Sequence, residues 1–386
     1  HHVTIAEKRP DRHKACGDSI NPRTVAELAR IGLDPLTLDA HPISGLRMTH
    51  GDRSVQVPWP AHPDFPTQGY VLRRSLLDPA LRAVAADAGA EVLMGHEAIT
   101  PIAERGFVRG ATLQRDDGST TNVRARFVVV ADGANSRFGR GLGTTRDRNW
   151  PYGIATRTYF ASGCSHERWI EAMIGLPDAS GAPIAGVGWV APEGDGTVNV
   201  GVGVLSSHRD VRSVNAVKLL ASFAARVAER WEYDPDEPLK HPTRFRVPLG
   251  GSVGPKMGPT FLVAGDAAGM ANPFNGAGVD AALMTGRVAS AVLDEALTSG
   301  NSTALQRYPS MLDDEVGRYN KVGRLTARFV GRPPILRPLL RFGMRSDAVM
   351  GGVLRIAANA LRSGEPGAAE RAYAIASLVS RSAPSW

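Results

Sequence analysis

Residues 261–280 decide the fold, and they read FLVAGDAAGMANPFNGAGVD. The first four residues, 261–264, are a continuous apolar run that predicts a buried strand. The run ends directly at Gly265 and Asp266. Ligands of open α/β sheets bind beyond the carboxyl ends of the strands. The Asp266 carboxylate is therefore expected to accept a hydrogen bond from a ligand hydroxyl, such as that of a ribose or ribityl chain.

The second half of this segment predicts a helix that begins beside the same ligand. Gly276 and Gly278, on either side of Ala277, let the backbone approach a ligand closely, and the start of a helix favours negative charge. A Gly-Asp pair by itself is more often only a turn capped by the aspartate. Together with Pro273 and the two glycines, it indicates a cofactor site.

Two further motifs place polar groups at the end of a strand or the start of a helix. A Val-rich strand runs into Asp132 and Gly133, which predict a turn. Arg74 stands at the start of a helix that is expected to end at Gly89. Its guanidinium can contact a phosphate or ribityl chain, or it can be a solvated group at the helix end. The residue pattern leaves both interpretations open.

The composition sets the broad class of the protein. The chain has 386 residues, of which 43% are apolar and 22% charged, so it is neither disordered nor fibrous. Its two cysteines exclude a disulfide framework and a Cys-rich zinc module, and no metal site is predicted. No apolar run is long enough for a transmembrane helix. The formal net charge of +7 permits an anionic partner, but no motif indicates nucleic-acid binding.

The order of strand and helix patterns predicts the architecture. Buried strands of parallel type lie towards both ends of the chain, and a glycine-rich stretch near 150–205 alternates as an antiparallel sheet does. From about Gly276 the pattern is almost entirely helical. We expect an α/β (α+β) protein, in which a β-rich domain splits a three-layer nucleotide-binding domain. The expected boundaries are 1–60, 61–145 and 251–300 for the nucleotide-binding parts, 146–250 for the β-rich substrate domain, and 301–386 for a helical C-terminal region.

The motifs at Arg74, Asp132 and Asp266, in this order, resemble those of the para-hydroxybenzoate hydroxylase-type flavoproteins. Two further groups of three segments each narrow the resemblance. The segments Lys14–Asp18, Gly188–Pro192 and Val198–Gly203 are similar to the geranylgeranyl reductases within that group. The segments around Pro22-Arg23, Asn272–Gly276 and Met344–Ser346 are similar to its menaquinone reductases.

The resemblance implies FAD as the cofactor, held in a Rossmann-like domain. The residues that it implies for FAD binding are Glu7, Arg74, Asp132, Gly133, Gly265, Asp266, Pro273, Gly276, Ala277 and Gly278. Cys16 is the catalytic candidate near the flavin, without being assigned as an acid, and a small packing residue is its alternative role. Trp189 and Pro192 are expected to line a prenyl channel or to belong to the sheet core. Asn199 either satisfies a buried turn or points at the flavin edge.

The chain departs from the family pattern at its start. The first strand and the Gly-x-Gly-x-x-Gly turn of the family do not occur in residues 1–60. Glu7 stands where the family's ribose-binding acid ends the second strand, a residue that follows the glycines by about 20 positions. We therefore expect this part of the FAD-binding domain to be incomplete.

The resemblance implies an FAD-dependent reductase that saturates an isoprenoid C=C bond of a polyprenyl lipid, with the menaquinone side chain as the expected substrate. NAD(P)H or a ferredoxin-like protein is the expected electron donor. Ten basic residues and one acid lie between Arg318 and Arg362, interleaved with apolar residues. They predict peripheral contact with the cytoplasmic face of a membrane, and a solvated helix face is the alternative. Two other functions stay open: an FAD monooxygenase of a small aromatic, and a truncated, non-catalytic lipid-binding module.

Overall fold

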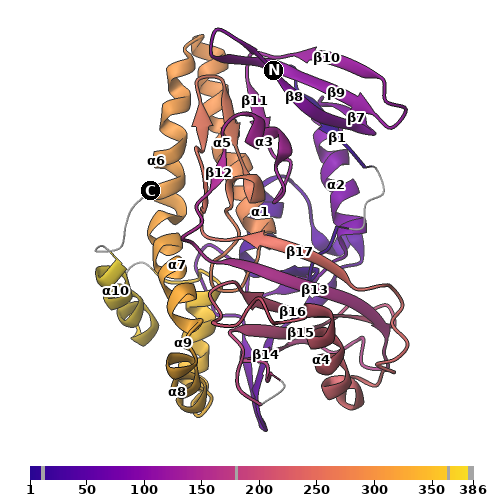
Figure 1. Cartoon of the computed structure of the whole chain (residues 1–386), viewed down its shortest axis with the longest axis vertical. Coiled ribbons are helices and arrows are strands. Elements are labelled where there is room, and N and C mark those ends of the chain that lie inside the picture. Colours follow the sequence, from indigo (N-terminus) through magenta and orange to yellow (C-terminus); the bar gives the residue numbers. More distant parts are fainter. Residues whose placement is uncertain (10–13, 179–180, 363–365, 381–386) are drawn as a thin grey trace.

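The computed structural model describes residues 1–9, 14–178, 181–362 and 366–380. The part that carries the N-terminus lies at one end of an elongated body, and a broad β-sheet lies at the other (Figure 1). Helices of the C-terminal region run along one side of both parts.

The parallel strands of the nucleotide-binding part form two patches. β1 (Thr4–Glu7) pairs with β7 (Glu91–Met94), and β11 (Val128–Val130) pairs with β20 (Phe261–Val263). β19 (Met257–Gly258) adds an antiparallel edge to β20. Among the described residues, no strand pairing joins the two patches. All three residues of β20 are buried, which confirms the buried strand expected there.

The nucleotide-binding part has three layers, as expected for the fold class. An apolar cluster joins Val108 of the outer sheet, Val130 of β11, Leu262 of β20, and Met284 and Val288 of the long helix after the glycines. The outer sheet has the order β10-β9-β8. The bounds of these elements are β8 (His96–Glu104), β9 (Phe107–Arg115), β10 (Thr120–Arg124), α1 (Pro22–Arg30), α2 (Arg74–Asp87) and α5 (Val279–Ser299).

A seven-stranded sheet forms the other end of the molecule, in the order β17-β13-β16-β15-β14-β4-β5. Its strands are β4 (Gly45–His50), β5 (Arg53–Pro58), β13 (Tyr152–Ala161), β14 (Trp169–Ile174), β15 (Gly186–Pro192), β16 (Thr197–Leu205) and β17 (Thr243–Pro248). All neighbours pair antiparallel except β4 and β14, which are parallel.

The position of β4 and β5 differs from the sequence analysis, which grouped 1–60 with the FAD-binding part. The backbone of β4 pairs with β14 from Gly45 to Thr49, so this hairpin extends the β-rich sheet. Strand pairing between segments more than a hundred residues apart leaves no local signal in either segment, which is why the sequence pattern did not indicate it. The division into domains stays a prediction.

The two faces of the large sheet are covered by different helices. α4 (Ala216–Trp231) packs on one face, where Phe223 and Trp231 join a cluster of strand residues. On the other face, Met48 and Ile43 pack with Met350 and Leu354 of α9 (Asp347–Ala357). The sheet is therefore buried on both sides.

The C-terminal region is helical, as predicted. α6 (Tyr308–Leu312) continues through a π-turn into α7 (Arg318–Val330), and α8 (Pro333–Gly343), α9 and α10 (Ala368–Ser380) follow. None of the helices within the described ranges is long and apolar enough to cross a membrane. The remaining elements are β2 (Ser19–Ile20), β3 (His41–Ile43), β6 (Gly69–Val71), α3 (Arg137–Gly141), β12 (Thr145–Arg146) and β18 (Val253–Gly254).

Candidate active site

Asp266 lies in the turn that follows β20, at the carboxyl end of a parallel pair. Gly265 has φ +57, a left-handed conformation that favours glycine, and it directs the chain from the strand into this turn. Gly278 lies close behind the carboxylate, because a Cβ placed on it would be 3.2 Å from Asp266 Oδ1. Burial raises the pKa of Asp266 to about 6, and the nearby cations Arg74 and Lys14 oppose that rise.

The loop 272–278 between Asp266 and α5 is held by two of its own side chains, which donate to a backbone carbonyl at the end of α9. The Ala357 carbonyl accepts hydrogen bonds from Asn272 Nδ2 at 3.0 Å, from Asn275 Nδ2 at 3.0 Å and from Tyr319 Oη at 3.0 Å. Within the loop, Gly276 has φ +76, so a residue with a side chain would be strained there. The backbone N–H of Ala277 donates to Asn275 Oδ1. The loop and the start of α5 therefore form a fixed, glycine-lined wall.

Arg74 is the first residue of α2, and its guanidinium is already positioned. It forms an ion pair with Asp78, four residues on, at 2.7 Å, and Lys14 Nζ lies 3.0 Å from the other oxygen of Asp78. The positive charge of the guanidinium also lies close enough to Cys16 to lower the pKa of its thiol. The spacing of an arginine and an aspartate at i and i+4 was the available signal for this arrangement. Arg74 thus links the Cys16 loop to the Asp266 side.

Cys16 lies in the segment just before β2 and is partly buried, so both the catalytic and the packing role stay open. Its Sγ accepts a hydrogen bond from the backbone N–H of Asp18 at 3.3 Å. Burial and the neighbouring Asp18 carboxylate raise the pKa of the thiol, whereas Arg74 lowers it. The net rise above the ordinary value keeps Cys16 as a neutral thiol at physiological pH.

Asp18 is a buried carboxyl group that the sequence analysis did not single out. Its Oδ2 accepts from Tyr159 Oη at 2.6 Å and from Asn199 Nδ2 at 2.7 Å. Asn199 Nδ2 also donates to the carbonyl of Cys16 at 2.9 Å. Burial raises the pKa of Asp18, and the hydrogen bond from Tyr159 and the charge of Arg157 oppose the rise. This network ties the Cys16 turn to two strands of the large sheet.

Cations surround the ring of Tyr159 on this side of the site. The guanidinium carbons of Arg157 and Arg73 lie 4.5 Å and 5.3 Å from the ring centroid, and Lys240 Nζ lies 5.4 Å from it. Arg73 also lies 3.5 Å from Glu193, whose pKa is raised by burial and by Asp18. The sequence analysis missed these residues, because Arg73, Glu193 and Lys240 come from segments far apart in the chain and meet the β13 side chains only in the folded protein.

The Trp189 indole lies where side chains at Gly17 and Gly201 would have to be, which explains why both motifs have glycine there. Its indole N–H donates to Asn199 Oδ1 at 3.1 Å. A Cβ on Gly201, its partner across β15 and β16, would lie 2.1 Å from the indole, and a Cβ on Gly17 would lie 3.3 Å from it. Pro192 is buried at the end of β15. Trp189, Asn199 and Cys16 therefore lie together, and the place of Pro192 in a prenyl channel or in the sheet core stays open.

Three further predicted cofactor residues lie at or just beyond the ends of β11 and β1. Asp132 is exposed, and its Oδ2 accepts from the backbone N–H of Phe138 at 3.1 Å, which fixes the turn before α3. Gly133 makes that turn with φ +80. Glu7 ends β1, where its Oε1 accepts from the backbone N–H of Arg9. Their roles toward a cofactor stay predictions.

Three comparisons with known proteins address the family. A family described as "FAD binding domain" matches residues 1–313. Menaquinone reductase of Mycolicibacterium smegmatis is 35% identical over 380 residues, which covers 98% of this chain and 90% of that protein. Menaquinone reductase of Mycobacterium tuberculosis is 36% identical over 349 residues, covering 90% and 82%. The chain belongs to the geranylgeranyl reductase family of FAD-dependent oxidoreductases.

The solved structures agree in fold. A geranylgeranyl bacteriochlorophyll reductase-like protein of Thermoplasma acidophilum superimposes with a TM-score of 0.72 at 23% identity, over 96% of this chain and 89% of that one. The cofactor of the chain described here is FAD, and this chain is an oxidoreductase that reduces prenyl groups. The resemblance found in the sequence is confirmed at this level.

The residues around Asp266 fit the cofactor. Among the described residues, no protein donor hydrogen-bonds to the Asp266 carboxylate, although it is largely buried and faces Arg74 and Lys14. A ribityl hydroxyl is a suitable donor for such a group. The start of α5 and the left-handed Gly276 leave backbone room for an electron-rich ring edge beside it.

Proposed function

We propose that this protein saturates one isoprenoid double bond of the menaquinone side chain, at the cytoplasmic face of a membrane. The observation that carries the proposal is the environment of Trp189. Its N–H reaches Asn199 beside Cys16, while its ring packs against the apolar cluster that contains Met350 and Leu354 of α9. The polar candidate site and an apolar path for a prenyl chain thus share one side chain.

A groove on the same apolar cluster supports this substrate class. It has a volume of about 670 Å³ and lies between the end of β5 and the helices α9 and α10. Val57 and Trp59 line it and also belong to the cluster that Trp189 joins. Arg355 and Arg362 lie on its wall, where they suit an oxygen-bearing ring or headgroup.

The chemistry requires a hydride and a proton. An isolated trisubstituted alkene is electron-rich, so one carbon takes a proton while the more substituted carbon, with cation-like character, takes the hydride. Bound FAD, once reduced by the electron donor, would supply the hydride and return to its oxidised form. The chain's own residues exclude water around the alkene through Trp189 and its cluster. Cys16 is the proposed catalytic residue near the flavin. Its thiol is neutral and lies close to the Arg74 guanidinium.

The cofactor contacts belong to the proposal as well. Asp266 accepts a ribityl hydroxyl, Arg74 contacts the ribityl chain or a phosphate, and Glu7 binds the adenosine ribose. The other proposed contacts are Asp132, Gly133, Gly265, Pro273, Gly276, Ala277 and Gly278. Trp189, Pro192 and Asn199 are proposed on the substrate side, and NAD(P)H or a ferredoxin-like protein is proposed as the electron donor.

The test is anaerobic reduction of menaquinone in detergent by the FAD-loaded protein, with dithionite as an electron source so that no natural donor has to be chosen. Mass spectrometry is expected to find a product with two added hydrogens in the side chain. Asp266→Asn is expected to lose flavin and product, whereas the exposed Asp87→Asn keeps both. In a parallel aerobic reaction with NADPH, an oxygen-dependent hydroxylated product would establish the monooxygenase instead. Lipid binding by a wild-type protein that retains no flavin would favour the non-catalytic module.

A further inference from the structure

Helix α10 buries its serines and exposes its apolar side chains. Ser377 and Ser380 are 5% and 2% exposed, whereas Ile375, Leu378 and Val379 are 65%, 58% and 59% exposed. A helix that packs only on its own protein has the opposite arrangement, because burial of apolar surface drives packing. The sequence analysis did not include this helix in the basic stretch that ends at Arg362.

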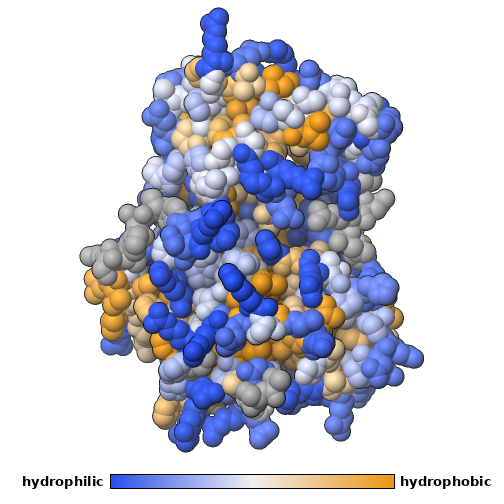
Figure 2. All heavy atoms as spheres, viewed as in Figure 1, coloured by the Kyte–Doolittle hydropathy of each residue, from blue (hydrophilic) through white to orange (hydrophobic). Residues whose placement is uncertain are grey.

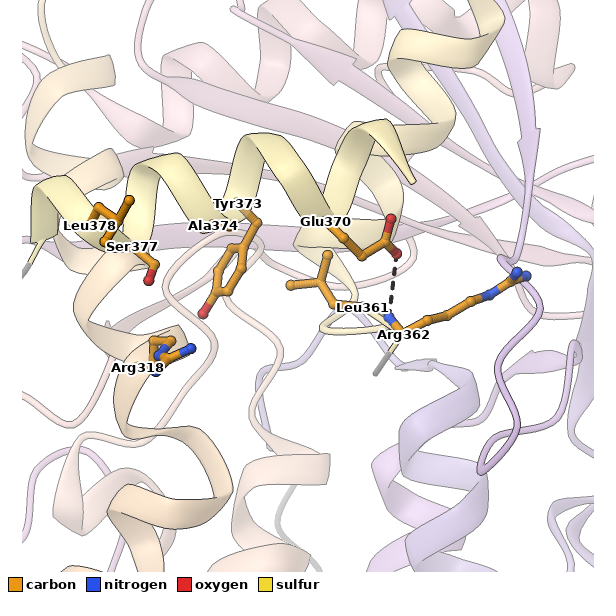
Figure 3. Close-up of a pocket in the computed structure, with 8 residues that line it drawn as sticks. All are labelled: Arg318, Leu361, Arg362, Glu370, Tyr373, Ala374, Ser377 and Leu378. Atoms are coloured by element: carbon orange, nitrogen blue, oxygen red, sulfur yellow. Dashed lines mark hydrogen bonds between the residues drawn. The ribbon is translucent and has the colours of Figure 1, made fainter. Parts of the chain in front are cut away.

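The inner side of α10 is not closely packed either. A slot of about 480 Å³ separates it from α7, and Figure 3 shows Tyr373 and Leu361 pointing into this slot with Arg318 of α7 on its other side. The helix is fixed at its start, where Glu370 accepts from the backbone N–H of Arg362 at 3.3 Å. α10 thus borders a slot on its inner side, while Ile375, Leu378 and Val379 are largely exposed.

Helix α8 and the residues that flank it carry a positive charge that α10 lacks. Residues 332–346 contain four arginines and no acidic residue. Arg337 and Arg341 are exposed, and so is Phe342, with 61% of its surface accessible. The guanidinium carbon of Arg345 lies 5.6 Å from the Phe342 ring. An exposed aromatic flanked by arginines suits the boundary between lipid headgroups and acyl chains.

These two helices belong to one end of the molecule. α8 and α10 both pack on α7, and α10 also packs on α9. Figure 1 shows them on the same side, and Figure 2 shows apolar residues gathered over α10 at the left edge of that view. We call Ile375, Leu378 and Phe342, with the arginines of 332–346, the α8–α10 surface.

We propose that the α8–α10 surface docks the protein on an anionic lipid bilayer, with Ile375, Leu378 and Phe342 at the acyl boundary and the arginines at the headgroups. This rests on the proposed function, in which the substrate is a membrane lipid. The positive charge of this surface favours a bilayer over a second copy of the chain. A two-fold dimer through this surface would bring the same four arginines against each other. A bilayer with anionic headgroups neutralises them instead.

The test is co-sedimentation with phosphatidylcholine vesicles, with and without phosphatidylglycerol. The wild type is expected to bind the anionic vesicles. The double variant Ile375→Glu/Leu378→Glu is expected to bind them with an affinity at least roughly tenfold lower. The matched control is Leu36→Glu/Leu239→Glu, which makes the same charge change at side chains that are 56% and 51% exposed outside this surface. It is expected to bind almost as the wild type does. Arg337→Gln/Arg341→Gln is expected to lose the preference for phosphatidylglycerol.

Equal binding by wild type and the α10 variant overturns the proposal, and so does an equal loss in the matched control. A wild-type dimer that only the α10 variant dissociates, with vesicle binding unchanged, shows that the surface pairs two copies and also overturns it. Menaquinone reduction in detergent separates this proposal from the proposed function. The α10 variant is expected to keep that activity, whereas failure of the wild type in detergent would defeat the function and leave vesicle binding to decide the surface.

Discussion

The two sides of the candidate active site differ in how the chain builds them. On the β20 side, Asp266 and the wall of glycines come from one continuous segment of twenty residues. On the Cys16 side, the polar groups come from separate places: Asp18 from the N-terminal part, Tyr159 from β13 and Asn199 from β16. The first side depends on backbone conformation, and the second depends on buried polar groups that satisfy one another.

This difference predicts how each side responds to change. A substitution on the β20 side acts locally, through one backbone angle or one carboxylate. A substitution on the Cys16 side leaves several buried donors without acceptors. The resulting loss in free energy of unfolding therefore affects both sheets that these donors join. The four substitutions below test this contrast, beginning with the largest expected effect.

Removal of the Asp18 carboxyl group is expected to have the largest effect. Asp18→Ala leaves Tyr159, Asn199 and Arg157 without their shared partner and places alanine at φ +55, so the free energy of unfolding is expected to fall by about 3 to 5 kcal/mol. Urea denaturation measures the change. Asp18→Asn is the control, since asparagine tolerates this φ and still accepts hydrogen bonds. Equal losses in both variants would show that the carboxyl network is not what holds the Cys16 turn.

Gly201→Ala is expected to cost about 3 kcal/mol, because the new methyl would overlap the Trp189 ring and force it to move. Thermal unfolding and the indole fluorescence report the change. Gly203→Ala, two residues along the same strand, is the matched control, because its Cβ would meet Trp189 only at 3.8 Å. The role of Trp189 as a close-packed lining residue would be wrong if both variants behaved alike.

Asp266→Asn is expected to stabilise the FAD-free protein near pH 7 by about 2 to 3 kcal/mol while it weakens FAD binding. The pKa of Asp266 is about 6 in the folded state and 3.8 ordinarily, so above pH 6 the folded protein holds a buried charge that the unfolded chain solvates. The wild type should therefore gain stability through this group as the pH falls from about 6 to about 4. Urea titrations across this range in both proteins measure it, and a variant with the wild-type pH dependence would exclude Asp266 as the titrating group.

Gly278→Ala is expected to have the smallest effect, a loss of about 1 kcal/mol together with weaker FAD binding. The new Cβ would lie 3.2 Å from Asp266 Oδ1, and the carboxylate has to shift by a few tenths of an ångström. Gly286→Ala in the middle of α5 meets nothing within 4 Å and is expected to stabilise by roughly 1 kcal/mol. Flavin retention after desalting distinguishes the two, and full retention in Gly278→Ala would show that the carboxylate position does not matter.

The contrast also explains how much could be predicted from the sequence. The strand that ends at Gly265 and the helix that starts after Gly278 follow from local patterns, and the structure confirms them. Asp18 stood inside a quoted motif without a role, because its partners Tyr159 and Asn199 face each other only through the register of β13 and β16. The pairing of β4 with β14 has the same cause. Burial and partners of this kind depend on tertiary contacts that no short pattern contains.

The Ala357 carbonyl carries a consequence for the whole protein. It accepts from both asparagines of the loop beside Asp266 and from Tyr319, and it lies at the end of α9, whose Met350 and Leu354 join the Trp189 cluster. A prenyl ligand that displaces α9 thereby strains the cofactor loop. Thermodynamic linkage then acts in both directions: if such a ligand changes the affinity for FAD by some factor, FAD changes the affinity for that ligand by the same factor. Because displacement of α9 strains the cofactor loop, each of the two ligands would then lower the protein's affinity for the other.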